Sequence, residues 1–296
     1  MSFGGETMGT SWQVQLAAGG VDTACARDLA AERLSLVVAQ MSHWDRGSVL
    51  SRFNVSRAEA WTSLPPEFAA VMRTALEVAA VSGGGFDPAA GALVDLWGNG
   101  PPGPRATPTG AAIADALSHG GWRALRWDEA GSRLRQPGSM RLDLSGIAKG
   151  YAVDLVAAAL ARIGVRHFLV EIGGELAGRG VRPDGEPWWV DLEAPPGLAV
   201  APLRLALHGI AVATSGSYVR GEHTLDPRAG RPVANNVVSV SVIADSAMLA
   251  DALATAITVC WPDIDTLLAR YPVAARIITS DGAEHLTPTL RTMLSD

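Results

Sequence analysis

Residues 141–154 have the sequence RLDLSGIAKGYAVD, and the fold class follows from what lies on either side of them. We predict a short strand that ends at Asp143-Leu144, and a helix that begins at Ser145-Gly146 and ends at Ile163. Short apolar runs separated by turn residues then predict a series of strands from His167 onward. Helices followed by strands, without regular strand–helix–strand alternation, predict an α+β fold rather than a doubly wound parallel one.

The remainder of the chain fits this class. The glycine- and proline-rich segment 98–110 predicts a loop, not a linker between domains, and no internal repeat is present. We therefore expect a single domain over residues 1–296. Hydrophobic spacing and capping residues predict helices over 22–41, 66–81 and 246–261, and strands over 11–16, 122–127, 133–135, 188–192, 203–207, 237–244 and 275–279.

Composition excludes several classes of protein. The chain is 48% hydrophobic and only 18% charged, which excludes disorder as its main property. Its net charge of −6 argues against nucleic-acid binding, which needs a basic face. Residues 1–12 lack the features of a signal peptide, and no apolar run is long enough to cross a membrane. The sequence as it stands predicts a cytoplasmic protein, or an exported or membrane-anchored one if a leader was removed.

The basic residues are unevenly divided between two types. Of the 24, only Lys149 is a lysine and the other 23 are arginines, a bias typical of a GC-rich genome. Lys149 falls in the first turn of the predicted helix, where the helix dipole disfavours a cation. A lysine there is better explained if a phosphate or a carboxylate lies beside it. Asp143 is the obvious partner within the chain.

A second candidate site lies on the segment SAMLADALATAITVC at residues 246–260. This helix is apolar almost all round, so we expect it to be buried. Asp251 and Thr255 are one turn apart on the same face. A buried carboxylate is costly unless it is paired or binds a cation, and two hard oxygens suit Mg²⁺ held partly by substrate phosphates. The alternative is that Asp251 pairs with an arginine and Thr255 bonds its own helix backbone.

Other singled-out residues are ambiguous on their own. His223 leads directly into a turn, and a loop histidine beside an aspartate is either a general base or a plain surface residue. Phe86 follows three glycines and could stack on a planar ligand or pack in the core. Cys25 and Cys260 have no metal-ligand spacing, and we expect both to be small core residues.

Together these segments resemble the ApbE family, the FAD:protein FMN transferases. Nine pieces occur in the family's order, which makes the resemblance far more specific than any one of them. They are Met8-Gly-Thr10, Met41-Ser42 with Ser51-Arg-Phe-Asn54, Gly85-Phe-Asp87, Leu96-Trp-Gly98, Asp143–Asp154, Val170-Glu-Ile-Gly-Gly-Glu175, Ala213-Thr-Ser-Gly216, His223-Thr-Leu-Asp-Pro227 and Leu249–Thr255.

The resemblance implies a fold and an activity. The fold would be α+β, with two packed lobes of antiparallel sheets flanked by helices, related to T-fold units. The enzyme would bind FAD with Mg²⁺ and transfer the FMN moiety to a Thr or Ser hydroxyl of an acceptor flavoprotein, releasing AMP. The acceptor motif of the family is roughly Asp-x-x-Ser/Thr-Gly-Ala-Thr, and this chain does not contain it, so we do not expect self-flavinylation.

The resemblance also assigns roles to individual residues. Asp251, Thr255 and the backbone carbonyl of Gly146 would hold the metal, although relatives usually have alanine at the last position. His223 would be the general base, and Lys149 would stabilise the transition state beside the nucleotide. The remaining positions that match FAD contacts are Met8, Trp44, Gly85, Phe86, Asp87, Asp143 and Thr224.

Two alternatives stay open at this point. A Mg²⁺-dependent FAD pyrophosphatase that yields FMN and AMP needs the same residues, and a non-catalytic FAD-binding protein would keep some of them. The chain departs from the family pattern in its lack of an export or lipoprotein signal. It also has a short segment between Tyr218 and His223, where the family has a longer hairpin near the site.

Overall fold

A computed structural model describes residues 1–17, 22–216 and 223–295, and it confirms the α+β class. Its centre is an eight-stranded sheet, and every strand pairing found among the described residues is antiparallel. The order across the sheet is β1 (Ser2–Thr7), β2 (Thr10–Leu16), β6 (Phe168–Ile172), β7 (Glu175–Arg179), β10 (Ile210–Gly216), β13 (Val237–Ala244), β14 (Ala274–Thr279) and β15 (Glu284–Leu286).

Three small antiparallel sheets accompany the large one. They consist of β3 (Trp61–Ser63), β5 (Arg133–Arg135) and β4 (Arg126–Asp128), of β8 (Trp188–Leu192) and β9 (Leu203–Leu207), and of β11 (Leu225–Asp226) and β12 (Arg231–Pro232). The helices are α1 (Thr23–Met41), α2 (Val49–Asn54), α3 (Pro66–Val81), α4 (Gly91–Leu96), α5 (Gly110–Ser118), the 3₁₀ turn η1 (Trp122–Ala124), α6 (Ala148–Arg162), α8 (Ala247–Cys260), α9 (Asp265–Arg270) and α10 (Pro288–Met293).

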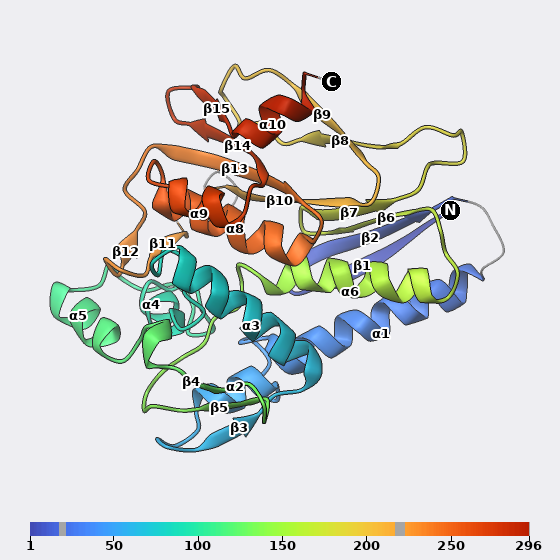
Figure 1. Ribbon diagram of the computed structural model, residues 1–296. Helices are drawn as coiled ribbons and strands as arrows, with labels where there is room; N and C mark the ends of the chain where they lie inside the picture. Colours follow the sequence, from blue (N-terminus) through green and yellow to red (C-terminus); the bar gives the residue numbers. More distant parts are fainter. Residues whose placement is uncertain (18–21, 217–222, 296) are drawn as a thin grey trace.

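The large sheet separates two hydrophobic cores. Helices α6 and α8 lie against one face, while the β8–β9 hairpin and α10 lie on the other (Figure 1). Side chains alternate between the faces, as they must in a strand: Val170 of β6 belongs to the helix-side core, and its neighbour Leu169 packs with the core that contains Leu207. The sheet is therefore buried on both sides, except where the second layer leaves room for a cavity.

Helices α6 and α8 cross in unusually close contact at Gly150. A Cβ atom at this position would overlap the carbonyl oxygen of Ala247 and lie 2.9 Å from the Cβ atom of Asp251. The start of α8 is fixed to α6 by a partly buried carboxylate as well. Asp154 accepts hydrogen bonds from the Ser246 hydroxyl at 2.7 Å and from two backbone N–H groups of α8 at 2.9 Å. These contacts set the position of every side chain on the two facing helix surfaces.

Several sequence predictions need correction. Helix α6 begins at Ala148 and not at Ser145, with a turn before it. Residues 141–144 are not a strand, because the Asn54 side chain hydrogen-bonds both backbone groups of Leu142 where a strand partner would. Residues 122–124 form η1, so strand β4 starts later than expected. Cys260 is buried as predicted, but Cys25 is exposed.

The predicted absence of a membrane-spanning segment can be compared with the helices that the structure describes. None of the helices in residues 1–17, 22–216 and 223–295 has the length and hydropathy needed to cross a membrane.

The crossing at Gly150 gives a first prediction. Gly150→Ala gains about 1 kcal/mol of helix propensity. It also forces the helices apart and breaks the bond from the Gly150 N–H to Asp251, which together cost more than that gain. We expect the free energy of unfolding, measured by urea denaturation, to fall by about 2 to 3 kcal/mol.

Gly110 provides the matched control, since it is a helical glycine whose Cβ atom would meet nothing within 4 Å. Gly110→Ala should leave stability unchanged or slightly higher. Equal effects of the two substitutions would show that the close crossing is not needed.

Candidate active site

A cavity of about 630 Å³ lies at the end of the large sheet where α6 begins. It is lined from the start of α6, from α8, from the β6–β7 turn, from the end of β10 and from the segment that follows residue 222. The structure thus brings together ten of the residues that the sequence singled out: Gly85, Phe86, Asp87, Asp143, Gly146, Lys149, His223, Thr224, Asp251 and Thr255.

The first turn of α6 is completed by a side chain from another helix. The first N–H groups of a helix have no partner within it. Here the N–H of Gly150 does not bond the carbonyl of Gly146, four residues earlier, but donates to Asp251 Oδ2 at 3.1 Å. A carboxylate at this position is favoured by the helix dipole, although burial still raises the pKa of Asp251.

Because the Gly150 N–H bonds Asp251, the carbonyl oxygen of Gly146 is left available. No hydrogen bond to the Gly146 carbonyl occurs in the part of the chain that the structure describes. Gly146 lies against Thr255, whose hydroxyl would be 2.9 Å from a Cβ atom added at Gly146. The Asp251 carboxylate, the Thr255 hydroxyl and residue 146 therefore meet at one wall of the cavity.

The sequence left open that Asp251 pairs with an arginine and that Thr255 bonds its own helix backbone. The structure shows neither contact among the described residues. Asp251 bonds a backbone N–H rather than an arginine, and the charge of Lys149 opposes the effect of burial on its pKa. Among the described residues it is Thr258, not Thr255, that donates its hydroxyl to the helix backbone, at 2.8 Å to the Ala254 carbonyl. Hard oxygen donors are the kind that fit Mg²⁺, and a carboxylate that accepts one N–H bond, as Asp251 does, still has lone pairs to offer. With a single carboxylate, this set would rely on substrate phosphates to complete the coordination.

Lys149 pairs with a residue that the sequence analysis did not single out. Its ammonium group donates to Glu175 Oε1, at the start of β7, and not to Asp143 as expected. Glu175 is 1% exposed, and burial raises its pKa to about 8, with Asp251 adding to the effect and Lys149 opposing it. Its second oxygen, Oε2, is buried without a hydrogen-bond partner among the described residues. The ion pair explains how a cation is held at the start of a helix.

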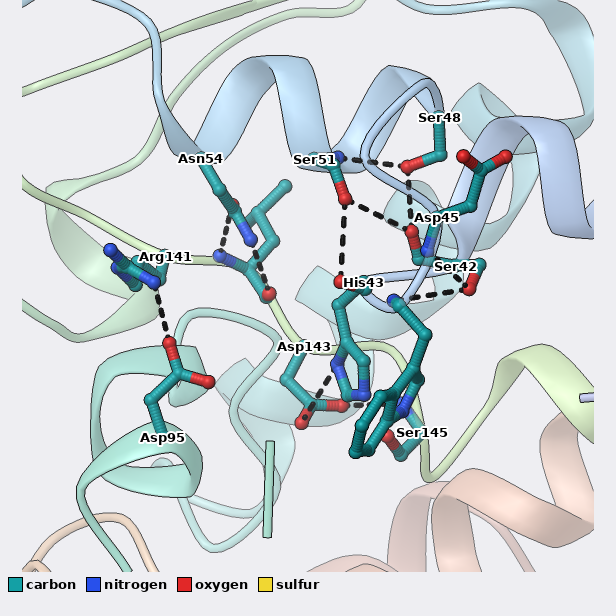
Figure 2. Close-up of polar contacts among 12 residues, drawn as sticks. Ser42, His43, Asp45, Ser48, Ser51, Asn54, Asp95, Arg141, Asp143 and Ser145 are labelled. Atoms are coloured by element: carbon teal, nitrogen blue, oxygen red, sulfur yellow. Dashed lines mark hydrogen bonds and ion pairs between the residues drawn. The ribbon is translucent and has the colours of Figure 1, made fainter. Parts of the chain in front are cut away.

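Asp143 instead belongs to a network that connects the segment 141–145 to the loop after α1 (Figure 2). One carboxylate oxygen accepts from the Ser145 N–H at 2.6 Å, and the other lies 3.5 Å from His43 Nδ1. Asn54 donates to the Leu142 carbonyl at 3.0 Å and accepts from its N–H at 2.7 Å. These bonds fix the backbone just before Gly146, and so fix one wall of the cavity.

Asp87 lies beside this wall, since the Asp143 N–H donates to the carbonyl of the next residue, Pro88, at 2.9 Å. Its carboxylate accepts from the N–H groups of Ala89 at 2.7 Å and Trp122 at 3.1 Å. Burial is the largest influence on this group and raises its pKa to about 6, against these two hydrogen bonds. Phe86 is buried and adjoins Gly146, so it packs in the core and lines the cavity at the same time.

Met8 and Trp44 do not line the cavity. Met8 lies in the turn between β1 and β2, with a positive φ of 48°, just before Thr10, which does line it. Trp44 is 63% exposed and packs its ring beside that of His43, at 5.5 Å between centroids. Their assignment to FAD contacts stays a prediction. His223 and Thr224 line the cavity, but the short segment at 218–222 lies outside the described residues.

Comparison with known proteins decides the family. Residues 8–277 match the model of the ApbE family. The chain belongs to the ApbE family. Two ApbE relatives, both named FAD:protein FMN transferase, come from Salmonella typhimurium (35% identical, covering 98% of this chain and 88% of the relative) and Vibrio cholerae (33% identical, covering 98% and 92%).

Solved ApbE structures have the same fold. The apo form of the flavinyl transferase ApbE from Pseudomonas stutzeri superposes with a TM-score of 0.91 at 33% identity, covering 100% of this chain and 97% of that one. The flavin transferase ApbE from Vibrio cholerae gives 0.91 at 31% identity, covering 99% and 98%. The α+β arrangement around the cavity is therefore that of the ApbE family.

The pKa of Asp87 gives a second prediction. An unfolded chain loses this proton near pH 3.8, whereas the native protein keeps it until about pH 6. Between these values the native state binds more protons than the unfolded state, so stability falls as the pH rises. Asp87 should account for a loss of about 2 kcal/mol of unfolding free energy between pH 4 and pH 7.

Urea denaturation of the wild type and Asp87→Ala across this pH range isolates the effect, because the variant should lack that part of the fall. Asp128 serves as the control: it is exposed, and its hydrogen bond from Arg133 lowers its pKa. Asp128→Ala should keep the full decline. An identical decline in Asp87→Ala would contradict the assignment.

Proposed function

We propose that this protein transfers the FMN moiety of FAD to a Thr or Ser hydroxyl of an acceptor flavoprotein and releases AMP. The names of the relatives support this activity, as does the match of residues 8–277 to the ApbE family model. The structural observation that carries the proposal is the wall where Asp251 completes the start of α6 and Lys149 lies beside it. A helix start with an ammonium group is suited to the pyrophosphate of FAD.

We further propose that Mg²⁺ is held by the Asp251 carboxylate, the Thr255 hydroxyl and the Gly146 carbonyl. When bound, Mg²⁺ would neutralise charge on the phosphate oxygens of FAD as the transferred phosphoryl group changes partners. All three residues line the same cavity, and Gly146 lies against the Thr255 hydroxyl, which supports the assignment. Glu175 would hold Lys149 in place, so that the ammonium stays in the cavity rather than extending into solvent.

We assign the steps of the transfer reaction to individual residues. The acceptor hydroxyl oxygen forms a bond to the FMN phosphorus, and the bond from that phosphorus to the AMP oxygen breaks. His223, which lines the cavity, takes the hydroxyl proton, a step that typically contributes about 10² to 10⁴ in rate. Lys149, in the first turn of α6, stabilises the charge that develops on the phosphoryl oxygens.

We also propose that residues 1–296 act as one domain. The helix-side core contains residues from β2 through β14, so no part of it is complete without the rest. The partners would be FAD and the acceptor protein. Water in place of the acceptor would turn the same site into an FAD pyrophosphatase, and mass spectrometry separates the two outcomes.

The proposal is tested by incubating the protein with FAD, Mg²⁺ and a peptide that carries the Asp-x-x-Ser/Thr-Gly-Ala-Thr pattern. A peptide adduct of FMN mass together with AMP is the expected result. FMN and AMP without an adduct would show a pyrophosphatase. If neither product forms although FAD binds, the protein is a binding protein and the proposal is wrong.

The metal assignment is tested with a pair of threonines on α8. Thr255→Ala should raise the Mg²⁺ concentration needed for half-maximal transfer at least tenfold, because a hard oxygen is lost. Thr258→Ala removes the same group three residues further on, where it bonds the Ala254 carbonyl outside the cavity, and should leave the Mg²⁺ requirement unchanged. Equal Mg²⁺ requirements in the two variants would contradict the assignment of Thr255.

The single lysine provides a further prediction. Lys149→Arg keeps the charge, but a planar guanidinium is larger and does not fit the pairing with buried Glu175 beside Asp251. We expect transfer to fall by about tenfold or more, as for other lost transition-state contacts. Arg141→Lys, in the half-exposed pair with Asp95, is the control and should have little effect. Wild-type turnover in Lys149→Arg would mean that the site does not distinguish the two cations.

A further inference from the structure

From the wall formed by α6 and α8, the cavity continues around the end of the large sheet to the other face of that sheet. On that side it is lined by the apolar residues Leu169, Leu176 and Val212 of three neighbouring strands. It is also lined by the consecutive residues 189–193, which comprise most of strand β8 and the residue after it. We name this part of the cavity, defined by these eight residues, the β8 arm.

The lining of the β8 arm shows that the cavity follows the edge of a strand. Side chains of β8 alternate in direction: Trp188 and Leu192 are buried, whereas Trp189 is 44% exposed and Asp191 is exposed too. A cavity over one face of β8 would be lined by every second residue. Lining by five residues in a row places the cavity along the backbone edge.

That edge has no partner strand in the described part of the chain. Strand β8 pairs with β9 alone, in a two-stranded sheet separate from the large one. Beyond this ladder, no backbone hydrogen bond in the described residues involves residues 189–193. Every second residue of β8 therefore directs an N–H and a C=O group into the cavity, over a length of about 16 Å.

The hairpin is held rigidly at its other side. Strand β9 lies against β7, where a Cβ atom at Gly178 would be 2.7 Å from the Leu207 carbonyl oxygen. The Gly209 N–H donates to the Gly178 carbonyl at 2.8 Å, and Trp188 Nε1 donates to the Arg179 carbonyl at 3.0 Å. These contacts leave the outer edge of β8 as a fixed template rather than a loop that folds away.

We propose that the acceptor protein binds by adding an extended segment to this edge of β8, so that its hydroxyl enters the cavity that His223 also lines. The inference rests on the proposed transfer function and names how its protein substrate is recognised. Main-chain bonds to β8 would hold the segment, and Leu169, Leu176 and Val212 would receive its inward side chains. The residues predicted to contact FAD, Gly85 to Asp87, lie beside Asp143 and Gly146 and are not among the eight that define the β8 arm, so we assign that arm to the acceptor.

Residue-resolved amide hydrogen exchange of the full-length protein tests this placement. The probe is the acceptor peptide with its reactive Thr replaced by Val, which binds but cannot be flavinylated. Without peptide, exchange along residues 189–193 should alternate, because only every second N–H bonds β9. With peptide, the exposed set should slow by about tenfold or more, as expected for each new hydrogen bond that protects an amide.

A second measurement uses the reactive peptide, N-methylated at one backbone position at a time. Strand addition predicts that kcat/KM for adduct formation falls by about tenfold at alternate positions and little at those between. The unmethylated peptide and the neighbouring position serve as controls, and the protein is unchanged throughout.

The outcomes separate the inference from the function on which it rests. Adduct formation without protection of β8, or N-methyl effects without alternation, would overturn strand addition while leaving flavin transfer intact. Protection of the β8 amides by FAD alone would place the flavin in the β8 arm, and would also overturn it. Absence of any adduct would refute the transfer function itself, and the inference with it.

Discussion

The site depends on one contact, the hydrogen bond from the Gly150 N–H at the start of α6 to the buried carboxylate of Asp251 on α8. It forms because glycine at position 150 lets the two helix backbones approach each other, which any Cβ atom would prevent. The bond satisfies a backbone donor that the helix cannot satisfy itself, and it fixes a carboxylate where the helix dipole favours negative charge. The Gly146 carbonyl, two residues before the start of the helix, accepts no hydrogen bond in the part of the chain that the structure describes.

The charged groups of the site lie around the contact between Gly150 and Asp251. Two buried carboxyl groups, Asp251 and Glu175, share the neighbourhood of a single ammonium, Lys149. Burial opposes ionisation of both acids, whereas the charge of Lys149 favours it. The divalent cation that we propose would also favour the ionised form of Asp251, and the phosphates that accompany it would balance Lys149.

Much of this could be predicted from the sequence, for reasons that differ between residues. Asp251 and Thr255 were found because a carboxylate one turn from a hydroxyl stands out on an apolar helix, and Lys149 because it is the only lysine. Glu175 was missed although its segment was noted, since a pair between helix α6 and strand β7 leaves no spacing signal. The start of α6 was placed three residues early, because no local pattern reveals that Asp251 takes the Gly150 N–H. The sequence likewise could not predict that one edge of β8 lacks a partner strand, because this depends only on how the strands are arranged in space.

The most direct test of these assignments is a crystal structure of the protein with FAD and Mn²⁺ in place of Mg²⁺, with the metal located by its anomalous scattering. The peak should lie in contact with the Asp251 carboxylate, the Thr255 hydroxyl and the Gly146 carbonyl, with the pyrophosphate of FAD between the metal and Lys149. A metal peak elsewhere in the cavity, or a pyrophosphate away from the start of α6, would contradict the central role given to the contact between Gly150 and Asp251.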